Sequence, residues 1–387
     1  MAKKMKAVRR VVTGNDAQGK SIVSWDGDAP ARHEGAVPGR GVTDYWVWNK
    51  TPQPLNGSAD ASLWPDEFPG PKGGGHLRTV HWLANHDVDG TVPPLVTPHA
   101  PVVSADGRSW DRGGGNNVTH SDMHKTESVD FGIVMEGERG LELDDITTVI
   151  RPGDIVIQVG AWHLWDSSRI GCLMAFDMIS AEFDKQGLGL QEEEIPVMLA
   201  KPNQVLPAGV KPQRRIITID KEPGKSSLVA DSFSPDVILD PARPGFALQR
   251  MWVIDSHPAR IVPETLHLPY VLVPPKTGTV LNVCTFPPDS NWSGKVSKAQ
   301  VEAFYKSARA SEICTSGTIP NHPYSQKSNT IDFCLVMEGE IFLILDTKEI
   351  HLRAGEFAVI RGGNHAWSNR STQSATVAIS SHDGVTE

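Results

Sequence analysis

Two histidines and one aspartate are the side chains of this sequence whose types and spacing are best suited to chemistry. His124 and Asp130 form a polar cluster with Thr126, and His163 follows after two apolar runs. Two neutral imidazoles and one carboxylate form the facial ligand set of non-haem Fe(II) enzymes, and the same set suits Zn or Mn. A metal held in this way keeps an open side for water, dioxygen or a chelating substrate.

The residues between these clusters alternate in the way that strands do. Apolar and polar residues alternate in Gly140–Asp144 and again in Asp154–Gln158, which predicts two half-buried strands. Turn signals separate them at Glu136–Glu138 and Pro152–Asp154. In a β-barrel alternate side chains point inward, so strands of this kind, closed into a barrel, would bring the polar clusters together in its mouth.

The same stretch recurs 202 residues later without a gap. Val129–Glu138 (VDFGIVMEGE) matches Ile331–Glu340 (IDFCLVMEGE), and the opening strand Arg10–Thr13 resembles Arg215–Thr218. The polar residues that fall on one another are His120 on His322, Asp130 on Asp332 and His163 on His365. A constant offset across several strands indicates an internal duplication.

The polar clusters resemble the two sequence motifs of the cupin family. The first motif is G-x5-H-x-H-x(3,4)-E-x6-G and the second is G-x5-P-x-G-x2-H-x3-N; they are matched here by His124, Thr126, Asp130 and Gly137, and by Gly153, His163 and Ser167. Thr126 stands in the place of the second His and Asp130 in the place of the Glu, and the second motif is one residue short and lacks its Pro. Since both halves carry the pattern, the chain resembles a bicupin. The resemblance implies an all-β fold of two tandem cupin (jelly-roll) barrels with minor helices.

The resemblance also implies metal-ligand roles for His124, Asp130 and His163. His120 and Thr126 are the candidate catalytic residues, and His120 is a candidate for the imidazole that Thr126 does not supply. The alternative is structural: a histidine in a β motif is often a hydrogen-bonded core residue. A short carboxylate such as Asp130 often ties a turn by accepting backbone N–H bonds.

The second half carries a weaker version of the site, formed by His322, Gln326, Asp332 and His365. Gln326 stands at the position of His124, and Ser328 stands at the position of Thr126. An amide oxygen can bind a metal, but the loss of an imidazole lowers the affinity for a transition metal. We therefore predict a mainly structural second barrel and unequal metal occupancy of the two barrels.

The chain divides by its repeats into an N-terminal cupin domain at 1–180, a linker at 181–213 and a C-terminal cupin domain at 214–387. The linker is expected to begin with a short helix over Leu188–Glu194, before a series of prolines. Ser297–Ala310 has helical spacing, with Ser297 as its N-cap. The insert Asp87–Thr119, rich in Pro and Gly, is interpreted either as a lid or interface arm or as surface decoration.

Composition and charge limit the partners. The net charge is −9 and the Lys and Arg residues are scattered, which disfavours nucleic acid and anionic membranes. No apolar run is long enough to span a bilayer, and we recognise no signal peptide. The four Cys show no C-x-x-C spacing, so we expect reduced thiols in a cytoplasmic protein.

The resemblance favours a metal-dependent enzyme that acts on a small organic, aromatic or enolic substrate, with one divalent metal per chain. Fe(II) and dioxygenase chemistry come first. Trp162 and Trp165 flank His163, and such an aromatic wall suits a planar substrate. One alternative is a non-redox Zn or Mn cupin, such as a polyketide cyclase, isomerase, lyase or hydrolase; another is a non-catalytic ligand-binding cupin. By analogy with cupins we expect a homo-oligomer, a dimer or larger.

Overall fold

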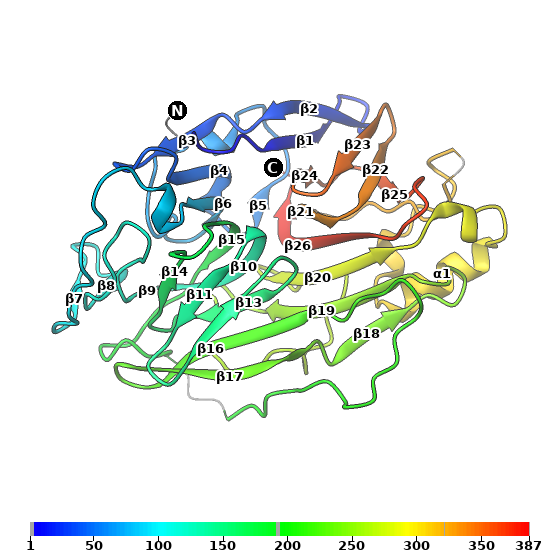
Figure 1. Ribbon diagram of the computed structural model, residues 1–387. Coiled ribbons are helices and arrows are strands. Elements are labelled where there is room, and N and C mark those ends of the chain that lie inside the picture. The colour runs from blue at the N-terminus through cyan, green and yellow to red at the C-terminus, as the bar shows by residue number, and fades with distance from the viewer. Residues whose placement is uncertain (1–3, 191–193, 321, 387) are drawn as a thin grey trace.

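The computed structural model describes residues 4–190, 194–320 and 322–386 (Figure 1). It is built from two large β-sheets, each extended by a smaller sheet that closes a barrel. The all-β prediction of two cupin barrels is confirmed. Among the described residues, no helix has the length and apolar character needed to cross a bilayer.

The large sheet of the first barrel has the order β17 (Lys225–Phe233), β16 (Arg214–Glu222), β13 (Ile155–Val159), β10 (Ser128–Gly137), β15 (Cys172–Ser180), β6 (Gly75–Trp82), β4 (Gly41–Trp48) and β3 (Ala31–Glu34). The large sheet of the second barrel has the order β2 (Ser21–Asp28), β1 (Arg9–Asn15), β24 (Phe357–Arg361), β21 (Thr330–Glu338), β26 (Ala375–Val385), β20 (Thr279–Phe286), β19 (Ala247–Ile254) and β18 (Asp236–Leu239), with β5 (Gln53–Pro54) beside β26. The two orders correspond strand for strand.

Three small sheets complete the barrels and one insert. They are β12 (Thr147–Ile150), β11 (Arg139–Glu142) and β14 (Leu164–Asp166); β23 (Glu349–Arg353), β22 (Glu340–Leu345) and β25 (His365–Ser368); and β7 (Val102–Val103), β8 (Ser109–Asp111) and β9 (His124–Thr126). The helical segments are α1 (Lys298–Ser307) and the 3₁₀ turns η1 (Ala61–Leu63), η2 (Asn85–Asp87), η3 (Asp289–Asn291) and η4 (Ser311–Ile313).

Each half contributes its opening hairpin to the sheet of the other half. Strand β1 runs parallel to β24, with Arg10 beside Phe357, and β16 runs parallel to β13, with Arg215 beside Ile155. In Figure 1 the blue hairpin β1–β2 therefore lies over the orange and red strands of the second barrel. The exchange covers edges of β13 and β24 that would otherwise expose unpaired backbone groups. The boundaries at 180 and 214 remain a prediction, but hydrogen bonding assigns both hairpins to the opposite barrel.

The two large sheets pack against each other through one face and line a barrel with the other. Phe131 and Phe333 belong to the apolar cluster between the sheets. Val134, on the opposite face of β10, belongs to the cluster inside the first barrel. Asp130 lies four residues before Val134 on the same strand and points to the same, inward face, since successive strand residues point to opposite faces.

Helix α1 begins at the residue that the sequence predicts, whereas the helix predicted in the linker is not found. Ser297 accepts the backbone N–H of Gln300, and the Gln300 side chain accepts the backbone N–H of Ser297 in return. The predicted helix over Leu188–Glu194 is wrong for 188–190 and for Glu194, and 191–193 lie outside the described residues. There the Asp184 carboxylate accepts the backbone N–H of Leu188 and ties a turn instead.

Candidate functional site

The mouth of the first barrel brings His124 and His163 together across a two-residue bridge. Each residue donates its backbone N–H to the carbonyl of the other, at 2.9 Å in both directions. The bridge places the two ring centroids 4.3 Å apart. The predicted pairing of these imidazoles is thus a consequence of strand register.

Both imidazoles are held in one tautomer. Nδ1 of His124 lies 2.6 Å from the carbonyl oxygen of Asp122, and Nδ1 of His163 lies 2.8 Å from that of Ala161. A carbonyl can only accept, so each Nδ1 carries the proton and each Nε2 keeps a lone pair. Burial lowers the pKa of both rings, which keeps them neutral. Among the described residues, no hydrogen-bond partner engages either Nε2 atom.

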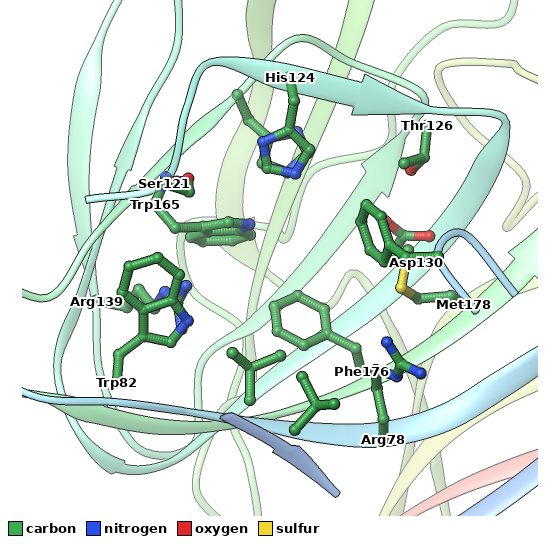
Figure 2. Close-up of a pocket in the computed structure, with 14 residues that line it drawn as sticks. Arg78, Trp82, Ser121, His124, Thr126, Asp130, Arg139, Trp165, Phe176 and Met178 are labelled. Atoms are coloured by element: carbon green, nitrogen blue, oxygen red, sulfur yellow. Dashed lines mark hydrogen bonds between the residues drawn. The ribbon is translucent and has the colours of Figure 1, made fainter. Parts of the chain in front are cut away.

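The imidazoles open onto a cavity of about 180 Å³ in the first barrel. Aromatic and aliphatic side chains form most of its wall. The lining residues are Val42, Phe68, Arg78, Val80, Trp82, Ser121, His124, Thr126, Asp130, Arg139, His163, Trp165, Phe176 and Met178. Figure 2 shows Arg139, Trp82 and Trp165 on one side of the cavity and Thr126 and Asp130 on the other.

Asp130 lines the cavity but does not complete a three-residue ligand set. Three His, Cys, Asp or Glu donor atoms within 4.8 Å of one another occur, in the described part of the chain, only at His33, Asp44 and Asp66. That group already contains the guanidinium of Arg78, at 2.9 Å from Asp44 and 3.1 Å from Asp66. The donor atoms of His124, Asp130 and His163 therefore do not all lie within 4.8 Å of one another.

The environment of Asp130 favours its neutral form. Burial raises the pKa of this carboxyl to about 7, a hydrogen bond from Ser128 lowers it, and the nearby charge of Asp177 raises it. Oδ1 is buried without a hydrogen-bond partner. The hydroxyl of Thr126 lies 2.7 Å from that of Ser128. Near neutral pH the carboxyl that faces the cavity, opposite Arg139, is therefore protonated in part of the molecules.

His120 lies outside the cavity wall. Its Nε2 atom is 3.1 Å from the carboxylate of Asp166, and it forms a β-bridge with the same residue. The geometry gives His120 a place beside strand β14 and does not make it a third imidazole next to His124 and His163.

The second barrel is filled where the first is hollow. Nδ1 of His365 faces the carbonyl of Gly363, so its Nε2 accepts a hydrogen bond from the Gln326 amide at 3.1 Å. The hydroxyl of Tyr305, from α1, donates to the other end of that amide at 3.3 Å. A void of about 20 Å³ remains beside Asp332 and His365. His322 instead packs its ring against Trp292.

Arg139 is a cavity residue that the sequence interpretation did not identify. It begins β11, and its side chain is almost fully buried. At the equivalent position of the second half stands Ile341, which is also buried. The available signal was that Arg139 in the first half corresponds to the aliphatic Ile341 in the second half. A comparison of the two halves of the sequence would have revealed it.

No family model matches the chain. It is 28% identical over 160 residues to the cupin-domain-containing oxidoreductase fogC of Aspergillus ruber, a match that covers 41% of this chain and 63% of that protein. It is 46% identical over 44 residues to the phomopsin biosynthesis cluster protein D of Diaporthe leptostromiformis, over 11% of this chain and 23% of that protein. The chain thus matches less than two thirds of the length of either relative.

Solved structures are similar at lower identity. A cupin 2 conserved barrel domain protein from Leptotrichia buccalis is 9% identical, with a TM-score of 0.32 over 79% of this chain and 83% of that one. Oxalate decarboxylase from Bacillus subtilis is 9% identical, with a TM-score of 0.34 over 79% of this chain and 68% of that one. The chain therefore has the fold of two cupin-type jelly-roll barrels in tandem, and part of it is similar to a cupin-domain-containing oxidoreductase.

Proposed function

We propose that the first barrel is the active site of a metal-dependent oxidoreductase that acts on a small, largely apolar organic molecule. The observation that carries the proposal is the pair of free Nε2 lone pairs facing an aromatic cavity. The corresponding His365 in the second barrel has its lone pair occupied by Gln326. The match to a cupin-domain-containing oxidoreductase supports the reaction class.

The donor chemistry of the site fits a divalent metal through two residues. His124 and His163 would hold it, and the remaining positions would be open to water or substrate. When bound, such a metal supplies Lewis-acid polarisation and, as Fe(II), the redox chemistry of a dioxygenase. Fe(II) remains our first choice among Fe, Zn and Mn.

The other cavity residues bind the substrate and exclude water. Trp165 packs edge-on against His163, with centroids 5.4 Å apart, and Phe176 packs against Trp165 at 5.7 Å. Phe68 is half exposed and lies edge-on to His124, at 6.1 Å. These rings offer flat apolar surfaces to a planar substrate, and Asp130, whose pKa is raised to about 7, can hold or release a proton on the opposite wall.

We expect one firmly bound divalent metal per chain. Replacing His124 or His163 with Ala removes one of two imidazole donors and should weaken metal affinity by more than about 100-fold. His365→Ala, in the filled second barrel, is the matched control and should leave the occupancy unchanged. Elemental analysis after anaerobic loading with Fe(II), Zn or Mn measures the wild type and the three variants. Two metals per wild-type chain, or equal occupancy in His124→Ala, would contradict the proposal.

The separation of Asp130 from the imidazole pair favours one alternative, a cupin that binds a small ligand without a metal. The same preparation decides between the two functions. Metal in wild-type protein with oxygen uptake on a panel of phenols and diketones supports the oxidoreductase. Metal-free protein that gains thermal stability from a panel compound, without turnover, supports the binding protein.

A further inference from the structure

In the described part of the chain, the guanidinium group of Arg139 is a buried cation without an ion-pair partner. The residue is 1% exposed, and its Nε and Nη1 atoms have no hydrogen-bond partner. It lies between two indoles, 4.8 Å from the ring centroid of Trp82 and 5.3 Å from that of Trp165. Burial lowers the pKa of Arg139 to about 10, and the Cys172 thiol beside it raises that pKa, so the group stays charged at neutral pH.

Other buried guanidinium groups in this chain have anionic or carbonyl partners. Arg78 is paired with Asp44, Arg215 with Glu264, Arg10 with Asp60 and Arg243 with Asp240, while Arg361 donates to the carbonyls of Asn56 and Gly57. An unpaired buried charge is unfavourable by several kcal/mol in general. The carboxylate of Asp166, which acts on Arg139 only at longer range, is in contact with His120 instead.

The barrel fold itself does not require this cation. The equivalent position in the second barrel is Ile341, which is fully buried in the apolar cluster of that barrel. The buried cation is therefore a feature of the hollow first barrel that the filled second barrel lacks. Because Arg139 lines the cavity, the group that satisfies its free donors would come from a molecule that enters it.

We propose that Arg139 anchors a carboxylate of the substrate, and that the substrate class is a small aromatic or unsaturated carboxylic acid. The carboxylate would sit on the free donors of Arg139, with the ring against Trp82, Trp165 and Phe176. Cavities of about 150 Å³ accept benzene, so a volume of 180 Å³ suits one ring with a short polar substituent. The placement of the reacting carbon beneath His124 and His163 rests on the proposed function; the anion site does not.

Benzoate and benzamide are a matched pair of probes, equal in shape and different in charge. Metal-free wild-type protein is titrated with each by calorimetry and by quenching of tryptophan fluorescence, since two indoles flank the site. We expect benzoate to bind at least about tenfold more tightly than benzamide, because a hydrogen bond to a charged group discriminates by roughly this factor or more. Equal affinities, or no benzoate binding, would refute the anion site.

Arg139→Gln should weaken benzoate binding by roughly 10- to 100-fold and leave benzamide binding nearly unchanged. Arg139→Lys keeps the cation and should retain part of the selectivity, which also decides the matter if the Gln variant does not fold. Arg151→Gln is the control, because it removes an exposed positive charge beyond the same hairpin. Unaltered benzoate affinity in Arg139→Gln would overturn the proposal. We expect His124→Ala to bind benzoate as wild type does. This result would support the anion site independently of the metal-dependent function.

Discussion

Glu264→Gln is expected to lower the free energy of unfolding by about 3–5 kcal/mol, because it leaves a fully buried arginine without its counter-charge. The side chains of Glu264 and Arg215 are both 0% exposed and their charged atoms lie 2.8 Å apart. Burial raises the pKa of Glu264, but the hydrogen bond and charge of Arg215, together with the backbone N–H groups of Leu266 and Met198, leave the pKa below its ordinary value. Urea denaturation followed by tryptophan fluorescence measures the loss.

The repeat supplies a matched control for this prediction. Arg10 occupies the position of Arg215 in the first half and is paired with Asp60, whose side chain is 22% exposed. Asp60→Asn should cost less, roughly 1–2 kcal/mol, because water can still solvate the partners. A loss in Glu264→Gln no larger than the loss in Asp60→Asn would contradict the assignment of a desolvated ion pair.

The same pair explains how the exchanged hairpins are secured. Strand β16 carries Arg215 and is hydrogen-bonded to β13 of the first barrel, whereas Glu264 follows β19 of the second barrel. The ion pair therefore ties the exchanged hairpin back to its own half. Arg10 on β1 and Asp60 form the corresponding connection in the other direction. Breaking one of them should loosen the contact between barrels as well as the local strand.

Local patterns in the sequence predicted individual helices and strands better than they predicted which strands pair with one another. The N-cap at Ser297 and the apolar face of α1 depend on contacts within one turn or two, and both are present. The exchange of β1 and β16 could not be read in the same way. Alternation shows that a strand has a buried face, but it does not say which sheet provides the parallel partner when that partner is remote in the sequence.

The same limit applies to the candidate site: the sequence predicted the types of residue in it but not the distances between their side chains. The motif placed His124 and His163 in one barrel mouth, where a backbone bridge joins them. It could not say that the Asp130 carboxylate stops short of them. Nor could the helical spacing of Phe304 and Tyr305 show that α1 lies over the second barrel, where Tyr305 contacts Gln326. Both facts depend on distances between elements remote in sequence.

Asp130→Asn is expected to remove a loss of stability that wild-type protein suffers as pH rises from about 4 to about 7. The folded-state pKa of Asp130 is about 7, above the ordinary value of 3.8, because the carboxyl is buried in the barrel. Between these two values the folded protein binds more protons than the unfolded chain, so the free energy of unfolding falls as pH rises. The shift corresponds to at most about 4 kcal/mol. Asn, which is neutral throughout, should be nearly equal to wild type at pH 4 and more stable above pH 7.

Ser128→Ala tests the direction of the same effect. The Ser128 hydroxyl stabilises the ionised carboxylate and so lowers the pKa of Asp130. Its removal should extend the decline in stability to higher pH, whereas Asp130→Asn should flatten it. Urea unfolding at intervals from pH 4 to pH 8 measures both variants beside wild type. A decline that persists unchanged in Asp130→Asn would assign the titration to another group. It would also remove the reason to treat Asp130 as the proton-holding wall of the cavity, opposite the cation at Arg139.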